Sequence, residues 1–386
     1  MPLRLGAASA KDPALRTFLE TRGDPDGPPC SLARDGASPT LPCDDADLRR
    51  LFKALVRFHY DEMTYNPRFG GEDLAFLLMR PNPLLTRSSA ADPDLLERLA
   101  AALTAPTEEG PDVHLFAQDA GVPSPWIALR HDLSPELHVL AERLAQENPW
   151  HVEPQADALL ARIQPRLTRT VPEGTRFFRA RVGHAGLEQA EVMEPWNASG
   201  QFEPYRAAEL SAAPPPHAHA GRLNRAGESC LYVSTDRETA IAESHPVPGQ
   251  KVSLGCFETR RALTIAELAE ADILDHFHSD EGLAELLLIR TLNQVVARPL
   301  RRRSEILRVS GGITVTQLVA ERLRRAGFDG ISYDSLMGTG RTMVVFEPQD
   351  LCYIDRDAAV LSVRGVRYMT DDLPIIPPRR SAMVPA

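Results

Sequence analysis

Cysteine is scarce in this sequence, and its spacing follows no known pattern. The five cysteines are an odd number and form neither a CxxC nor a CxxH motif. We therefore expect neither a disulfide framework nor a zinc knuckle, and we predict no metal site. Because few, unpaired thiols suit a reducing compartment, the composition predicts a cytoplasmic protein.

Long apolar runs are also missing. The first ten residues lack the apolar stretch of roughly 7–15 residues that marks a signal peptide. No other stretch approaches the ~18 apolar residues of a membrane-spanning helix. The sequence therefore predicts no secretion by a signal peptide and no membrane partner.

Positive charge is in deficit. The chain has 43 Lys and Arg residues against 53 Asp and Glu residues, a formal net charge of −10. An acidic chain repels a phosphate backbone unless its basic residues cluster. The short basic run of Arg298, Arg301, Arg302 and Arg303 is more typical of solvated surface. We therefore expect no nucleic-acid partner.

The 386 residues exceed one typical domain of about 100–200 residues, so we expect two domains. Helical spacing of apolar residues predicts a helix from Asp47 to Met63, and further helices that open at Pro93 and Pro135. Short strands follow. The predicted organisation is a flexible lead-in at residues 1–45, a helical N-terminal domain at 46–165, an α+β domain at 166–355 and a C-terminal tail at 356–386.

Within the predicted α+β domain, residues 183–220 are rich in proline and read as a long insertion or lid. A capping box of Thr314 and Gln317 predicts a helix that ends at Gly327. The predicted strands are centred on Phe177 and on Cys230–Val233, Val252–Phe257, Ile331–Tyr333 and Met343–Phe346.

Three polar residues gather around the strand Cys230–Val233. Arg222 precedes this strand, Tyr232 lies near its end, and Glu243 lies on the helix that starts at Thr235. Glu238 suits a capping box with Thr235, which gives it a structural role. Glu243 shares a helix face with small residues, so we expect a partly buried carboxylate that needs a cationic partner. Arg222 and Arg179 are the candidates.

These residues resemble the RES family. The order Phe178-Arg179, Gly221-Arg222-Leu223-Asn224, Tyr232, Ala240 and Glu243 is similar to its motifs. The stretch Phe328–Ser335 followed by Val344-Val345-Phe346 is similar to its closing motif, which places the family's serine at Ser335. The family takes its name from such an Arg, Glu and Ser, and the resemblance covers roughly residues 173–350.

The resemblance implies an ADP-ribosyltransferase-like fold with short twisted sheets, and a toxin-like enzyme that cleaves the nicotinamide–ribose bond of NAD⁺. NAD⁺ is then the substrate, inorganic phosphate is a candidate co-substrate, and no cofactor is implied. By position, Arg179 and Arg222 would bind the pyrophosphate, Tyr232 would pack on nicotinamide or ribose, Glu243 would stabilise the ribosyl cation, and Ser335 would orient a ribose hydroxyl. Many relatives act in toxin–antitoxin pairs, which implies an antitoxin or regulatory protein partner.

Several alternatives stay open at this stage. Water, phosphate or a protein could accept the ADP-ribose, so a mono-ADP-ribosyltransferase is the alternative enzyme, and an NAD⁺-sensing module without turnover is the alternative outside catalysis. The N-terminal helices are interpreted as a scaffold, a homodimer interface or a sensor. Gly338, Gly340 and Arg341 fit an anion-binding turn or a tight strand connection equally well. His217 and His219 are interpreted as solvated, and Asn224 as a turn residue.

Overall fold

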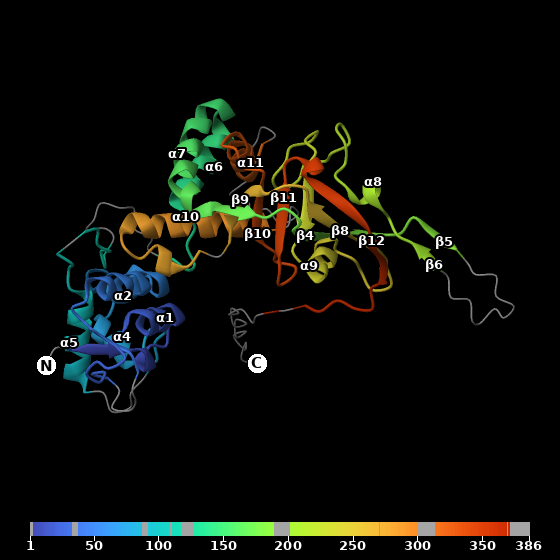
Figure 1. Ribbon diagram of the computed structural model, residues 1–386. Helices are drawn as coiled ribbons and strands as arrows, with labels where there is room; N and C mark the ends of the chain where they lie inside the picture. Colours follow the sequence, from blue (N-terminus) through green and yellow to red (C-terminus); the bar gives the residue numbers. More distant parts are fainter. Residues whose placement is uncertain are drawn as a thin grey trace, which may run out of the picture.

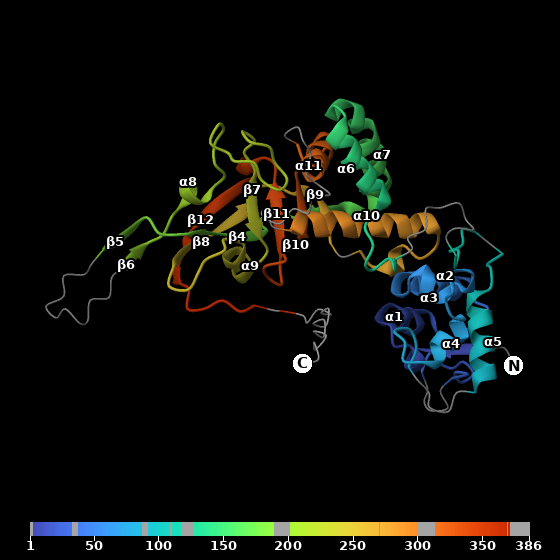
Figure 2. The same cartoon turned by 180° about the vertical axis from the view of Figure 1, so that it is seen from behind.

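The protein has an α+β architecture with helices at its N-terminal end and a mixed sheet at the other, as the sequence predicted (Figure 1). Helix α10 (Asp280–Ala297) runs from the N-terminal helices toward the sheet in both views (Figures 1 and 2). The computed structural model describes residues 3–32, 38–86, 92–108, 110–116, 127–188, 201–269, 271–298, 313–368 and 370.

Helix α2 (Ala46–His59) is the central element of the N-terminal region. Asp45 caps it by accepting a hydrogen bond of 2.8 Å from the backbone N–H of Leu48. The helix ends before Met63, contrary to the prediction, because Asp61 caps a new short helix, α3 (Glu62–Tyr65). The other elements of this region are β1 (Arg4–Gly6), η1 (Ala7–Ser9), α1 (Pro13–Arg22), β2 (Thr40–Pro42), η2 (Pro67–Phe69), α4 (Leu74–Met79) and α5 (Pro93–Thr104).

The prediction of a flexible lead-in over residues 1–45 is wrong for the part that the structure describes. Leu5, Leu15 and Leu19 are fully buried in the same hydrophobic cluster as the apolar face of α2. Strand β1 pairs antiparallel with β2, and Asp12 caps α1. The glycines and prolines of this stretch punctuate short packed elements, so composition alone gave the wrong picture.

Helices α6 (Pro135–Gln146) and α7 (Pro149–Leu167) pack on the C-terminal part of the chain. Leu140, Leu160 and Ile163 share a hydrophobic cluster with α10, α11 (Val315–Arg325) and the sheet. Helix α7 continues through Pro165 to Leu167. A proline so close to the end of a helix disturbs little hydrogen bonding beyond it. The predicted domain limits stay a prediction, since the two clusters meet on α10.

The sheet has the strand order β12-β8-β4-β7-β11-β10-β9-β3, and all neighbours are antiparallel except β10 and β9. Strands β4 and β7 are paired only between Phe178 and Ser234, so the sheet opens at this point. The predicted strands form as β4 (Arg176–Val182), β7 (Leu231–Ser234), β8 (Lys251–Thr259), β10 (Gly330–Asp334) and β11 (Arg341–Val345). The sheet also contains three strands that were not predicted, β3 (Thr168–Val171), β9 (Leu263–Leu268) and β12 (Leu351–Ser362).

Two segments that the sequence left irregular contain regular structure. In the predicted lid, β5 (Gly186–Glu188) and β6 (Gln201–Glu203) form a ribbon that projects from the body (Figure 1), and α8 (Ala207–Leu210) follows it. The tail expected from residue 356 begins as the second half of β12, which pairs with β8 across an irregularity in register. Residues 189–200, the basic run at 301–303 and the prolines after residue 371 lie outside the described residues.

Candidate active site

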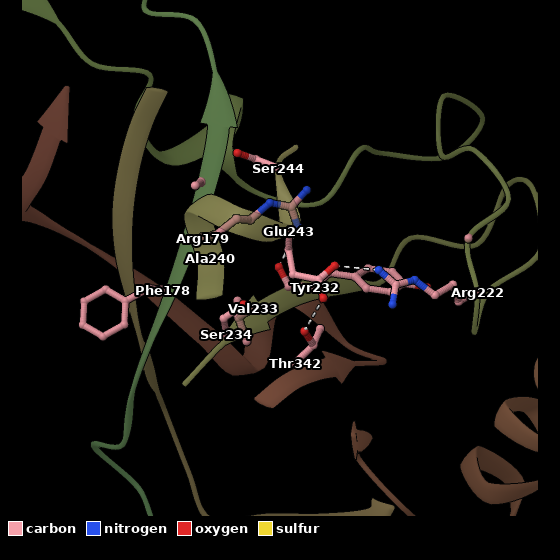
Figure 3. Close-up of a pocket in the computed structure, with 12 residues that line it drawn as sticks. Phe178, Arg179, Arg222, Tyr232, Val233, Ser234, Ala240, Glu243, Ser244 and Thr342 are labelled. Carbon is pink, nitrogen blue, oxygen red and sulfur yellow. Dashed lines mark hydrogen bonds and ion pairs between the residues drawn. The ribbon is translucent and has the colours of Figure 1, made fainter. Parts of the chain in front are cut away.

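A pocket of about 250 Å³ opens where β4 and β7 separate. Strand β4, strand β7 and helix α9 (Arg237–Glu243) form its walls, and the loop before β7 closes one end. Figure 3 shows these side chains in place. The lining residues are Phe178, Arg179, Ala180, Gly221, Arg222, Tyr232, Val233, Ser234, Ala240, Glu243, Ser244 and Thr342.

The turn from β7 into α9 places Glu243. Asp236 caps the helix by accepting a hydrogen bond of 2.7 Å from the N–H of Thr239. The predicted capping box of Thr235 and Glu238 does not form, because the Thr235 hydroxyl instead accepts a hydrogen bond from the N–H of Arg341, at 2.9 Å. The start of α9 is thereby tied to β11, across the sheet from β4.

The Glu243 carboxylate is held by three side chains. Its Oε2 accepts a hydrogen bond of 2.6 Å from Arg222, and its Oε1 accepts from the hydroxyls of Ser335 at 2.7 Å and Thr342 at 3.4 Å. The side chain is 13% exposed, so the carboxylate sits at the pocket wall with few water contacts. Charge-assisted bonds of this kind fix the direction of a carboxylate.

Arg222 lies between Glu243 and the end of α10. Its Nη1 donates to the carbonyl oxygens of Val296 and Ala297, at 3.3 and 3.1 Å, where the negative end of the helix dipole favours a cation. Its guanidinium carbon lies 5.5 Å from the centre of the Tyr333 ring. Burial acts to lower the pKa of Arg222, but Tyr333 and Glu243 outweigh it and the pKa is raised.

Tyr232 turns its hydroxyl toward the loop that carries Arg222. The hydroxyl donates to Oδ1 of Asn224 at 2.9 Å and accepts from the N–H of Leu223 at 3.1 Å. The Asn224 amide donates to three carbonyl oxygens of its own loop, as expected of a turn residue. A Cβ on Gly221 would lie 2.5 Å from the Tyr232 oxygen, so only glycine allows this approach.

Arg179 faces the pocket from β4 without an acidic partner among the described residues. Its Nη1 donates to the backbone carbonyl of Tyr232 at 3.2 Å. Burial lowers its pKa to about 10, and the nearby charge of Arg181 adds to the effect. The guanidinium is still a cation at neutral pH. It has unused N–H groups that suit an anionic ligand.

Ser335 lies behind the Glu243 carboxylate rather than on the pocket wall. It is 9% exposed, and its oxygen also accepts a hydrogen bond of 3.0 Å from the N–H of Met337. The glycines of the following turn pack on α9, and Gly340 donates to the Thr239 hydroxyl. Arg341 is paired with Glu267 and Asp334. This turn is therefore a tight strand connection rather than an anion-binding loop.

The structure brings Arg179, Arg222, Tyr232 and Glu243 to one pocket and places Ser335 directly behind it. Sequence reasoning missed Thr342, because its place beside Glu243 depends on β11 pairing with β7. Among the described residues, no three His, Cys, Asp or Glu side chains are grouped as metal ligands, and no helix is long and apolar enough to cross a membrane.

Comparison with known proteins finds a family match for the C-terminal part of the chain. No curated protein matches the chain. Among solved structures it is similar to a chain of the M. tuberculosis MbcT–MbcA toxin–antitoxin complex, with 12% identity, coverage of 53% of this chain and 92% of that chain, and a TM-score of 0.30. Residues 194–358 match the family model described as the RES domain. This range includes Arg222, Tyr232, Glu243 and Ser335 but not Arg179, and over these residues the chain matches the RES domain family.

Proposed function

We propose that this protein cleaves the nicotinamide–ribose bond of NAD⁺ and so depletes NAD⁺ in the manner of a toxin. The observation that carries the proposal is the Glu243 carboxylate, which Arg222 holds at the wall of the pocket (Figure 3). Ser335 holds the other carboxylate oxygen from behind. The RES match over residues 194–358 supports the same substrate class.

Cleavage of the nicotinamide–ribose bond needs little general acid or base catalysis. Nicotinamide leaves NAD⁺ as a neutral molecule, and positive charge then develops on the ribose as an oxocarbenium ion. A fixed, preorganised carboxylate stabilises such charge without having to reorganise. We assign this role to Glu243. The pocket lining contains no histidine among the described residues, in keeping with a reaction that needs no strong general base.

The remaining side chains suit the rest of the substrate. Arg179, with unused N–H groups, is the better candidate for the pyrophosphate, because Arg222 is engaged by Glu243 and by α10. Tyr232, which also lines the pocket, offers an aromatic surface for the nicotinamide ring. A pocket of about 250 Å³ suits the nicotinamide–ribose half of the dinucleotide rather than the whole molecule.

The deciding experiment is incubation of the purified full chain with NAD⁺, with and without inorganic phosphate, followed by chromatography. Nicotinamide release supports the proposal. Free ADP-ribose identifies a glycohydrolase, phosphorylated ADP-ribose a phosphorylase, and label retained on a protein band a mono-ADP-ribosyltransferase. A folded protein that binds NAD⁺ and leaves it intact is instead a sensing module and overturns the proposal.

A toxin that depletes NAD⁺ harms the cell that produces it unless its activity is inhibited. We propose that an antitoxin or other regulatory protein binds this chain, and that expression without it depletes NAD⁺ and slows growth. Expression of the Glu243→Gln variant in parallel separates toxicity by turnover from toxicity by misfolding. Equal growth defects from both forms would count against an NAD⁺-consuming toxin.

A further inference from the structure

The loop that carries Arg222 presents three carbonyl groups to the first turn of α11. The carbonyl of Arg222 accepts a hydrogen bond of 2.6 Å from the Thr316 hydroxyl. The carbonyls of Gly221 and Asn224 each accept a hydrogen bond of 2.9 Å from one atom, Nε2 of Gln317. The backbone on both sides of Arg222 is therefore held by a helix almost a hundred residues further along the chain.

Gln317 uses its whole side-chain amide in this arrangement. Its Oε1 accepts from the N–H of Thr314 at 3.0 Å and completes the capping box of α11. Its two amide hydrogens go to the carbonyls of Gly221 and Asn224. The side chain is 5% exposed, so water has little access to these groups.

The capping box alone would accept glutamate as readily as glutamine, since it needs only a side-chain oxygen. The two donated bonds are what require the amide. These two hydrogen bonds do not contribute to the cap of α11. They join the Gln317 side chain to the backbone of the Arg222 loop. Arg222 in turn must reach Glu243 at 2.6 Å and the carbonyl of Ala297 at 3.1 Å at the same time, which tolerates little movement of its backbone.

We propose that Gln317 is a positioning residue for Arg222, and through it for the Glu243 carboxylate. The proposal rests on the proposed NAD⁺-cleaving function for its kinetic consequence. Gln317→Glu keeps the cap oxygen but turns a second carboxylate oxygen toward two carbonyl oxygens. The repulsion displaces the loop. A displacement of about 1 Å in a catalytic group costs up to ~10²-fold in rate, so kcat for nicotinamide release should fall roughly tenfold to a hundredfold.

Two comparisons separate positioning from general destabilisation. Ser134→Ala removes the N-cap of α6, far from this loop in the chain, and should lower Tm while kcat stays unchanged. The double variant Arg222→Ala with Gln317→Glu should be no slower than Arg222→Ala alone, because Gln317 acts through Arg222. Additive losses, or an equal loss of kcat in Ser134→Ala, would overturn the proposal. If Gln317→Glu does not fold, Gln317→Met, which removes the donors without adding charge, replaces it.

Hydrogen exchange tests the same idea without NAD⁺. The amides of Gly221 and Leu223 are bonded to Asn224 O and Tyr232 Oη. They should exchange at least several-fold faster in Gln317→Glu than in Ser134→Ala. If the wild-type protein cleaves no NAD⁺, the proposed function fails while this measurement still decides the role of Gln317. Unchanged exchange in the Arg222 loop refutes that role, whatever the enzyme does.

Discussion

Ser335 donates a hydrogen bond of 2.7 Å to the carboxylate of Glu243, although the two residues lie 92 positions apart in the chain. The Ser335 oxygen also accepts from the N–H of Met337, which leaves its proton directed at Glu243. With Arg222 on the other carboxylate oxygen, rotation of the carboxylate would break a bond on each side. The acid is therefore presented to the pocket in one orientation.

Glu243→Gln should lower the rate of nicotinamide release by a factor on the order of 10²–10³, because the amide keeps the shape but removes the charge that stabilises the developing cation. NAD⁺ binding, followed by calorimetry, should change little. Glu238→Gln is the matched control, since Glu238 is exposed on the same helix and should retain full activity. Near-normal turnover in Glu243→Gln would show that the carboxylate is structural.

Ser335→Ala should reduce kcat roughly tenfold to a hundredfold without abolishing it, because one hydrogen bond to a charged group is worth about 1.5–3 kcal/mol. No histidine bonds to the Ser335 hydroxyl among the described residues, so we expect no covalent intermediate. Mass spectrometry of the enzyme during turnover checks this. A modified Ser335, or a complete loss of activity, would instead identify a nucleophile.

Arg179→Gln should raise KM for NAD⁺ more than it lowers kcat, since the unpaired cation is assigned to the pyrophosphate rather than to the breaking bond. Arg181→Gln is the comparison on the same strand. Its guanidinium donates to the Glu209 carbonyl and stacks on Tyr205, so its loss should leave KM unchanged. A fall in kcat at constant KM would place Arg179 at the reacting ribose.

Asp280→Asn should destabilise the fold by about 3 kcal/mol, because it leaves the buried guanidinium of Arg57 without a charge partner. Asp280 also accepts from the backbone and the ring of His114, which adds to the loss. Urea unfolding measures the change. Glu136→Gln breaks the half-exposed pair with Arg162 and should cost no more than about 1 kcal/mol. Equal effects would mean that the Arg57–Asp280 pair contributes no more than a surface pair.

Local signals in the sequence were sufficient for most elements. Periodic apolar residues and an aspartate cap predicted α2, and Thr314 with Gln317 predicted the start of α11. The first part of the predicted lead-in was misread although it carries a local signal. Asp12 and Pro13 start a helix, and Leu15, Phe18 and Leu19 lie at helical spacing on its buried face. The burial of Leu5, by contrast, depends on the long-range packing of this region around α2.

The residues of the candidate site were named from the sequence, and so was an arginine partner for Glu243, but their other connections were not. The role of Arg222 as a pyrophosphate ligand stays a prediction, and the hydrogen bonds from its guanidinium to the carbonyls of Val296 and Ala297 were not foreseen. Those carbonyls belong to the backbone more than seventy residues away. Because every residue has a backbone carbonyl, the sequence does not indicate which of them will bind Arg222. The place of Thr342 beside Glu243 likewise follows from strand order, which periodicity cannot give.

Helix α10 belongs to both hydrophobic clusters. Leu283, Leu286 and Leu287 in its first half pack with the N-terminal helices, and Leu292 and Val296 in its second half pack with the sheet. A helix of 18 residues spans about 27 Å as one rigid rod. Neither hydrophobic cluster can therefore unfold without exposing the apolar side chains of one half of α10 to water. We therefore expect the chain to unfold as one cooperative unit with a single calorimetric transition. A fragment limited to residues 194–358 would keep α10 but would expose the apolar side chains of its first half to water.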